Sequence, residues 1–140
     1  MFLLDTNVVS EAMRPAPNAV VEAWFARIER SSLFLSSISK AELLHGLALM
    51  PVGKRKIEVA AVIWRFLAEE LRTDILAFGT AEAEHYAEIL ALRRGRGRPM
   101  SQSDAQIAAI ARSRGLALAT RNVRDFEDCG VEIVNPWEPA

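Results

Sequence analysis

Three acidic residues and one amide lie at positions that suit the binding of a divalent cation. Asp5 ends a short apolar run near the start of the chain, and Asn122 follows a second such run. Glu42 and Asp104 each come three residues after a serine, near the expected start of a helix. Carboxylate and amide oxygens suit Mg²⁺ or Mn²⁺, which prefer hard oxygen ligands. A cation held in this way activates water and neutralises charge on a phosphate under attack.

Each of these residues also has a purely structural explanation. Asp5 and Asn122 are turn formers, and Glu42 and Asp104 have the spacing of a capping box, where an acid gains about 0.3–1 kcal/mol from the helix dipole. Considered together, however, two bare carboxylates about 4 Å apart repel by roughly 4 kcal/mol at an effective dielectric constant near 20. A fold would not gather three of them for stability alone, so their convergence would indicate a cation site.

An alternation of short apolar strands and helices would bring these residues together. We expect strands at residues 2–4, 33–35, 75–78, 116–119 and 131–134. We expect helices that begin near residues 10, 19, 40, 54, 80 and 102. This order predicts an α/β domain with a mainly parallel five-stranded sheet and helices on both faces. Ligands bind at the carboxyl ends of such strands, where all four candidate groups are expected to lie.

Composition limits the class of protein. The chain has 140 residues, of which 51% are hydrophobic and 25% charged, so we expect a single domain over residues 1–140. The lone Cys129 excludes an intramolecular disulfide and a cysteine-based metal cage. The start shows no signal-peptide pattern, and the most apolar stretch, residues 59–67, is too short to span a bilayer. We therefore expect a cytoplasmic protein with no membrane association.

Arginines are concentrated in one acid-free segment, residues 89–103. They are Arg93, Arg94, Arg96 and Arg98. On its own such a run indicates a solvated helix end. Beside an active centre it would attract the phosphates of a nucleic acid.

The chain resembles the PIN-domain ribonucleases, in particular the VapC- and FitB-like toxins of bacterial toxin–antitoxin pairs. The matching stretches are FLLDTNVVSE, SSISKAELLHGL, MSQSDAQIAAIA and LALATRNVRDFEDCGVEIVNPW, which follow one another along essentially the whole chain. The resemblance implies a PIN-like three-layer sandwich. The family's first three acids fall on Asp5, Glu42 and Asp104, while Asn122 stands where a fourth acid is frequent.

The resemblance also implies an activity and roles for further residues. The activity is that of a Mg²⁺- or Mn²⁺-dependent endoribonuclease, whose metal-activated water leaves 5′-phosphate and 3′-hydroxyl ends on RNA. From its spacing alone, Asp125 would share a face with Asn122 if this turn is helical, and would then supply the missing fourth charge. The alternative is a solvent-facing acid of the turn. The remaining assigned residues are Thr6, Asn7 and Thr120 as supports of the site, and Arg121 with Arg93, Arg94, Arg96 and Arg98 as contacts to the RNA backbone.

Partners follow from the same resemblance. It implies a cognate antitoxin that covers the acidic rim, and assembly as a homodimer or a dimer of dimers. Helical faces with large apolar side chains are either part of that interface or part of the core, and we favour the core for most of them. These side chains are Trp24, Phe25, Trp64 and Phe66.

Two other readings of the sequence compete with a nuclease. A metal-dependent phosphatase of the haloacid-dehalogenase type also begins with a strand and an aspartate, but it has a second aspartate where this chain has Asn7. A non-catalytic interaction domain would use Asp5, Glu42 and Asp104 only for turns and caps. In that case each substitution by alanine would cost ~1 kcal/mol of stability and no activity.

Overall fold

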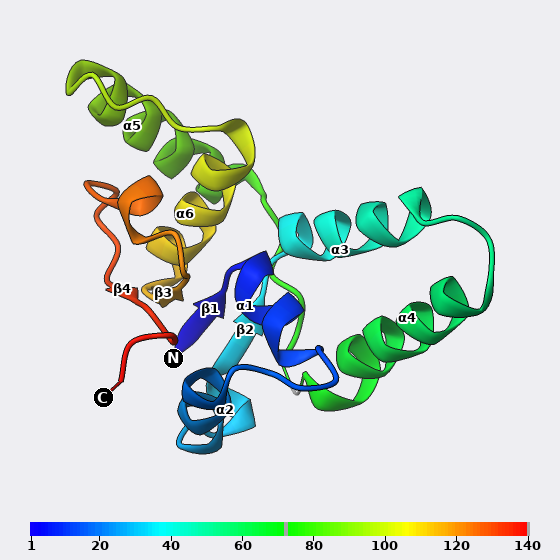
Figure 1. The fold of residues 1–140 in the computed structure, drawn as a ribbon. Coiled ribbons are helices and arrows are strands. Elements are labelled where there is room, and N and C mark those ends of the chain that lie inside the picture. Colours follow the sequence, from blue (N-terminus) through cyan, green and yellow to red (C-terminus); the bar gives the residue numbers. More distant parts are fainter. Residues whose placement is uncertain (72, 140) are drawn as a thin grey trace.

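A computed structural model describes residues 1–71 and 73–139 of the chain. Its strands are β1 (Phe2–Leu4), β2 (Leu33–Leu35), β3 (Ala117–Ala119) and β4 (Ile133–Val134). Its α-helices are α1 (Thr6–Ala12), α2 (Ala19–Ala26), α3 (Ser37–Leu49), α4 (Lys54–Arg65), α5 (Thr80–Gly95) and α6 (Gln102–Arg114). Its short helical turns are η1 (Arg30–Ser32), η2 (Phe66–Glu70) and η3 (Val123–Phe126). Figure 1 shows the arrangement of these elements.

The strands form one parallel sheet in the order β2-β1-β3-β4. In its two central strands, Leu3 is paired with Leu118 and Leu4 with Ala119. Because side chains alternate between the faces of a sheet, these pairs point to opposite sides. Leu3 and Leu118 belong to a core cluster shared with α5 and α6, and Leu4 and Ala119 to one shared with α1, α2, α3 and η2. The predicted α/β sandwich with helices on both faces is confirmed.

The sheet differs from the prediction at residues 75–78, which we expected to form a fifth strand. Only Leu76 pairs there, through an isolated parallel bridge to Ser36 beside the end of β2. Its N–H donates to the carbonyl of Leu35, and its own carbonyl accepts from the N–H of Ser37. The chain then reaches Gly79, the N-cap of α5, so the ladder ends after one residue. The described sheet therefore has four strands and a bridge.

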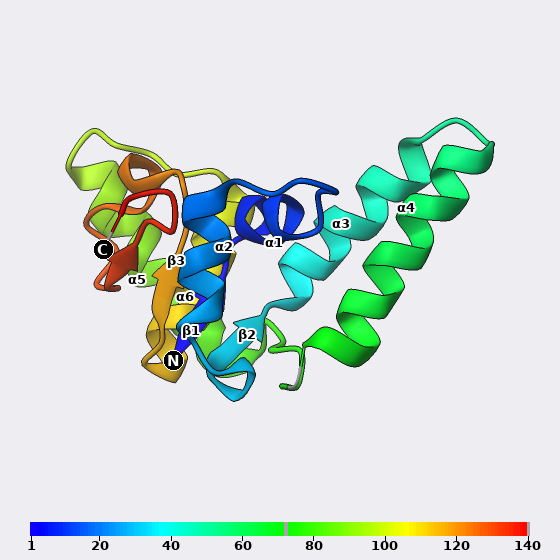
Figure 2. The same cartoon turned by 60° about the horizontal axis from the view of Figure 1, so that its bottom comes forward.

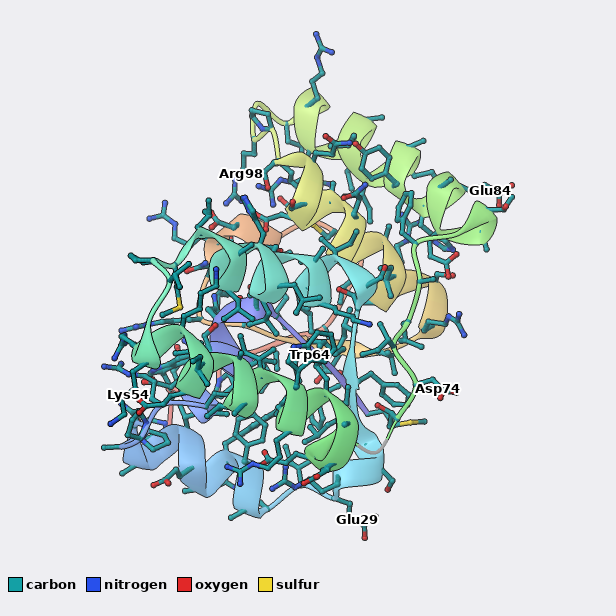
Figure 3. All side chains as sticks on the ribbon, turned by 90° about the vertical axis from the view of Figure 1, so that its right-hand side faces the viewer. Glu29, Lys54, Trp64, Asp74, Glu84 and Arg98 are labelled. Atoms are coloured by element: carbon teal, nitrogen blue, oxygen red, sulfur yellow. The ribbon has the colours of Figure 1, made fainter. Side chains whose placement is uncertain are left out.

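Helices α3 and α4 form an antiparallel pair that extends away from the sheet (Figures 1 and 2). Of the large apolar residues considered above, Trp24 and Phe66 are buried in the core and Phe25 packs against it. Trp64 on α4 is 50% exposed and is the exception to the expected core role (Figure 3). Among the described helices, none is long and apolar enough to cross a membrane.

Candidate active site

An open groove of about 590 Å³ lies at the carboxyl ends of β1 and β3. The chain crosses from one side of β1 to the other between β2 and β3, so this is the point where strand order reverses and where ligands bind in open α/β sheets. Residues from α1, α3, α6 and the segment after β3 line the groove. They are Asp5, Thr6, Asn7, Ser10, Glu11, Arg14, Glu42, Asp104, Arg121, Asn122 and Trp137.

Asp5 lies at the junction of β1 and α1, where it is the N-cap of the helix. Its N–H donates to the carbonyl of Ala119 at 2.9 Å, which ties it to β3. Its carboxylate accepts two hydrogen bonds of 2.8 Å, from the N–H of Thr6 and the hydroxyl of Thr120. Asp5 is only 6% exposed, and burial raises its pKa, while these two hydrogen bonds oppose the rise. Both oxygens are therefore fixed at the floor of the groove.

Thr120 holds the segment after β3 as well as Asp5. Its buried hydroxyl donates to Asp5 Oδ2 and accepts from the N–H of Asn122 at 3.0 Å. Asn122 lines the groove, and within the described chain its side-chain amide makes no hydrogen bond. The amide oxygen is thus free to contact a ligand.

Glu42 approaches the groove from α3. The hydroxyl of Thr6 contacts Ser39 Oγ at 3.0 Å and Glu42 Oε1 at 3.3 Å, and so links α1 to α3. Helix α3 starts at Ser37, with Ser36 as its cap, so Glu42 lies in the second turn and takes no part in capping. The capping explanation of Glu42 is therefore wrong, because the helix starts earlier than the sequence indicates.

Asp104 reaches the groove from the first turn of α6. Ser101 caps this helix by accepting a hydrogen bond from the N–H of Asp104 at 3.2 Å, as the capping-box spacing predicts. The carboxylate is half-buried and lines the groove. Asp104 therefore follows a capped helix start and also faces the candidate site.

The electrostatics of the groove are those of a cluster of like charges. Burial is the largest cause that raises the pKa of Asp5, Glu42 and Asp104. The charge of Asp5 also raises the pKa of Glu42 and of Asp104, and Asp104 raises that of Glu42. The hydrogen bonds from Thr6 and Ser101 and the charge of Arg93 act in the opposite direction. Three elements have thus brought together carboxylates that destabilise one another.

The carboxylates surround the groove without closing on a common point. In residues 1–71 and 73–139, no three His, Cys, Asp or Glu side chains are close enough together to hold a metal ion. Asp125 on η3 raises the pKa of Asp5 and Asp104 but lines a neighbouring pocket. Its link to the acidic cluster is electrostatic.

The arginines after residue 92 differ from the sequence expectation. Arg93 is buried, and its guanidinium donates to the carbonyls of Arg98, Asp125 and Glu127, so its assignment as an RNA contact is corrected to a structural role. Arg96 and Arg98 pair with acids of the turn at residues 127–128. Arg94 is exposed.

Four groove residues were not predicted from the sequence, namely Ser10, Glu11, Arg14 and Trp137. The first three lie on or just after α1, which starts at Thr6. From that start, polar residues recur every three or four positions at Asn7, Ser10 or Glu11, and Arg14. This period would have indicated a polar helix face had the helix been expected to begin there.

The fold and the groove define a class of protein, an α/β domain with an acidic site at the carboxyl edge of a parallel sheet. The profile of the PIN domain family matches residues 2–131, and the chain belongs to this family. It is 43% identical over 138 residues to the plasmid stability protein StbB of Pseudomonas syringae pv. tomato, with 99% of each chain covered. It is 38% identical to the VapC ribonuclease Y4jK of Sinorhizobium fredii, with both chains covered in full.

A solved structure shows the same architecture. A chain in the structure of FitAB bound to the IR36 DNA fragment superposes with a TM-score of 0.93 at 34% identity, with 100% of this chain and 98% of that chain covered. The resemblance to PIN-domain toxins of the VapC and FitB type is confirmed.

Proposed function

We propose that this protein is a metal-dependent endoribonuclease toxin of a toxin–antitoxin pair. The observation that carries the proposal is the gathering of Asp5, Glu42 and Asp104, from three separate elements, around one groove. The relatives support it, since they include a protein named as a VapC ribonuclease and one named for plasmid stability.

The groove offers a donor set that fits Mg²⁺ or Mn²⁺. Because no three acids of the described residues are close enough together to hold an ion among themselves, Asp5, Glu42 and Asp104 would hold the cation in part through water, and the amide oxygen of Asn122 would add an uncharged ligand. Positive charge would relieve the mutual repulsion that raises the pKa values of these acids. Water would complete the coordination, as is usual for Mg²⁺. When bound, the cation lowers the pKa of a water nucleophile and offsets charge on the phosphate under attack.

The chain itself fixes the groups that meet the substrate. Thr120 and the N–H of Thr6 hold both oxygens of Asp5, and the hydroxyl of Thr6 orients Glu42. Arg121 lines the groove and Arg94 is exposed, so both can attract an RNA backbone. Hydrolysis would leave 5′-phosphate and 3′-hydroxyl ends, and the proposed site of action is the cytoplasm.

The partners proposed for this protein are an antitoxin and a second copy of the chain. A relative 36% identical over 137 residues is named toxin FitB, and the related structure holds FitAB bound to a DNA fragment, which supports a bound partner protein here. Exposed Leu49, Val52 and Ile57 at the end of the α3–α4 pair, with Trp64 on α4, supply apolar surface for a homodimer or a dimer of dimers.

The proposed function is tested by incubating the purified protein, free of its partner, with total RNA in Mg²⁺, Mn²⁺ or EDTA. We expect discrete cleavage in either cation and none in EDTA, with cut sites mapped by sequencing of the new 5′ ends. Intact RNA under every condition would favour the non-catalytic interaction domain instead.

Metal binding should appear in thermal stability without reference to activity. We expect Mg²⁺ or Mn²⁺ to stabilise the wild type by about 2.7 kcal/mol at a hundredfold excess over Kd. In EDTA, Asp104→Asn should melt above the wild type, because the raised pKa of Asp104 means that its ionisation at neutral pH opposes folding. The same variant should respond weakly to the cation. Differential scanning calorimetry checks both results, and an equal metal response in wild type and variant would contradict a cation at Asp104.

The hydroxyl of Thr120 should matter through Asp5. Thr120→Val keeps the shape of a fully buried side chain but removes the hydrogen bond that lowers the pKa of Asp5. We expect cleavage to fall by about 10–100-fold, as for other groups that orient metal ligands. The loss should shrink as pH rises, because a higher pH restores the ionised carboxylate. Thr80→Val, which removes an exposed hydroxyl outside the groove, is the control, and an equal loss in both variants would contradict this role.

A further inference from the structure

Arg121 and Trp137 meet at the rim of the acidic groove. They follow the carboxyl ends of the neighbouring strands β3 and β4, which are joined there by the hydrogen bond from Thr120 N–H to the Val134 carbonyl. The guanidinium carbon of Arg121 lies over the indole ring of Trp137, 5.2 Å from its centroid. Both residues line the groove that holds Asp5, Glu42 and Asp104.

The two side chains are held from below and open above. Trp137 packs against the core cluster of Leu4 and Ala119, and its backbone N–H donates to Asn135 Oδ1 at 3.0 Å. The N–H of Arg121 donates to Asn7 Oδ1 at 3.4 Å, while its side chain is exposed. The indole ring is therefore fixed against the core, and the guanidinium lies over its solvent-facing side.

Arg121 also differs from Arg14 and Arg96 in having no acidic partner among the residues that the structure describes. Arg14 pairs with Glu11 at 3.2 Å, and Arg96 pairs with Asp128 at 2.8 Å. Within the described part of the chain, no carboxylate lies within 4.0 Å of the Arg121 guanidinium. Its contact is an aromatic face, so its plane is supported and its charge is not neutralised.

We propose that the Arg121–Trp137 pair is a stacking platform for an unpaired nucleobase of the RNA whose phosphate lies over the acidic groove. The inference rests on the proposed ribonuclease function. Unstacked bases of single-stranded RNA are recognised on aromatic rings and on guanidinium planes, and arginine supplies both a plane and a charge. In a duplex the bases are stacked on each other and do not reach such a platform. The pair therefore selects single-stranded segments and fixes one nucleotide beside the scissile bond.

The test separates stacking from simple attraction of phosphate. Arg121→Lys keeps the charge and removes the plane, and Trp137→Leu removes the ring but keeps an apolar side chain. Binding of a fluorescein-labelled single-stranded RNA of about 12 nucleotides is measured by anisotropy in an Asp104→Asn background, which prevents cleavage. We expect each change to raise Kd by about 5–50-fold, with an unchanged dependence on salt. Trp137→Phe, which keeps an aromatic ring, should lie between wild type and Trp137→Leu and guards against a folding defect.

Matched controls come from residues of the same type outside the platform. Arg27→Lys changes an exposed arginine outside the groove, and Trp64→Leu changes the half-exposed tryptophan on α4 (Figure 3). Both should leave the Kd for this RNA unchanged. The protein with an intact platform should bind the corresponding duplex more weakly than the single strand. The platform variants should bind the duplex with the same Kd as the protein with an intact platform.

Abasic RNAs identify the contact directly. Removal of the base at one position next to the cleavage site should weaken binding to the intact platform, and this penalty should disappear in Arg121→Lys and in Trp137→Leu. A penalty that persists in full in both variants would overturn the inference. So would an Arg121→Lys variant that binds like the intact protein while Arg121→Ala binds weakly with a smaller salt dependence, since that pattern describes a phosphate contact.

The inference and the proposed function fail in different ways. The platform alone would be overturned if the wild type cleaves RNA but the loss of affinity for abasic RNA is the same in the intact protein and in the platform variants. Absence of both cleavage and RNA binding would overturn the two together.

Discussion

An Asp5→Asn variant is expected to keep the fold of the wild type and to lose RNA cleavage by at least ~100-fold in Mg²⁺ or Mn²⁺. The lower bound follows because loss of a group that only orients a metal ligand already costs about 10–100-fold, and Asp5 is proposed as a ligand itself. The fold should survive because asparagine keeps an oxygen that accepts the N–H of Thr6 and caps helices as well as aspartate does.

The measurement is single-turnover cleavage of an RNA with a mapped site, beside a circular dichroism melt of each protein. Asp74→Asn is the control, since Asp74 is an exposed carboxylate on the loop that leads to α5, outside the groove (Figure 3). Full activity of the Asp5 variant would contradict the metal site, and a phosphorylated Asp5 trapped from the wild type would indicate the phosphatase mechanism instead.

The alternation of elements and the edge of the sheet that holds the site were predictable from the sequence. Apolar runs such as residues 2–4 and 116–119 end in polar residues, which marks both the strands and their carboxyl ends. The parallel arrangement then places Asp5 and Asn122 at the same edge of the sheet. That β1 and β3 are neighbours is known only from the strand order in the structure. Residues 75–78 are equally apolar, but only Leu76 pairs with the sheet, and apolar composition alone does not distinguish a single bridge from a strand.

The start of α1 and the role of Asp5 were harder to predict because they depend on contacts far along the chain. Asp-Thr-Asn favours a turn by local chemistry, yet the structure uses Asp5 as a helix cap. The Ala119 carbonyl and the Thr120 hydroxyl, more than 110 residues away, fix its backbone and its second oxygen. No local pattern reports such a bond, so the supporting role of Thr120 could be suggested only by resemblance.

The arginine segment shows the same limit for charged residues. Residues 89–103 contain no acid, so they appear free to bind phosphate, but the fold brings the turn at residues 127–128 against them. Arg96 and Arg98 then pair with acids that are distant in sequence. Of this group, Arg94 and Arg121 are exposed and have no acidic partner among the described residues.

Arg93→Met is expected to destabilise the protein by about 3 kcal/mol or more, because it leaves three carbonyls without their charged donor. Arg93 is 4% exposed, and its guanidinium donates to the carbonyls of Arg98 at 2.7 Å and Asp125 at 3.1 Å, as well as to that of Glu127. In a chain of this length the loss corresponds to a fall in Tm of roughly 10 °C, which a calorimetric melt measures directly. Methionine fills most of the space, so the effect reports the lost hydrogen bonds more than a cavity.

Its neighbour on the same helix provides the matched control. Arg94→Met removes the same charge from an exposed position and should change stability by less than about 0.5 kcal/mol. Arg93→Lys keeps the charge but lacks the planar set of guanidinium N–H donors, so its loss of stability should be smaller than that of Arg93→Met but not zero. Because Asp125 lies in η3 and Glu127 ends it, hydrogen exchange in residues 122–128 should speed up in Arg93→Met and not in Arg94→Met. Equal Tm values for the two methionine variants would contradict the structural role of Arg93.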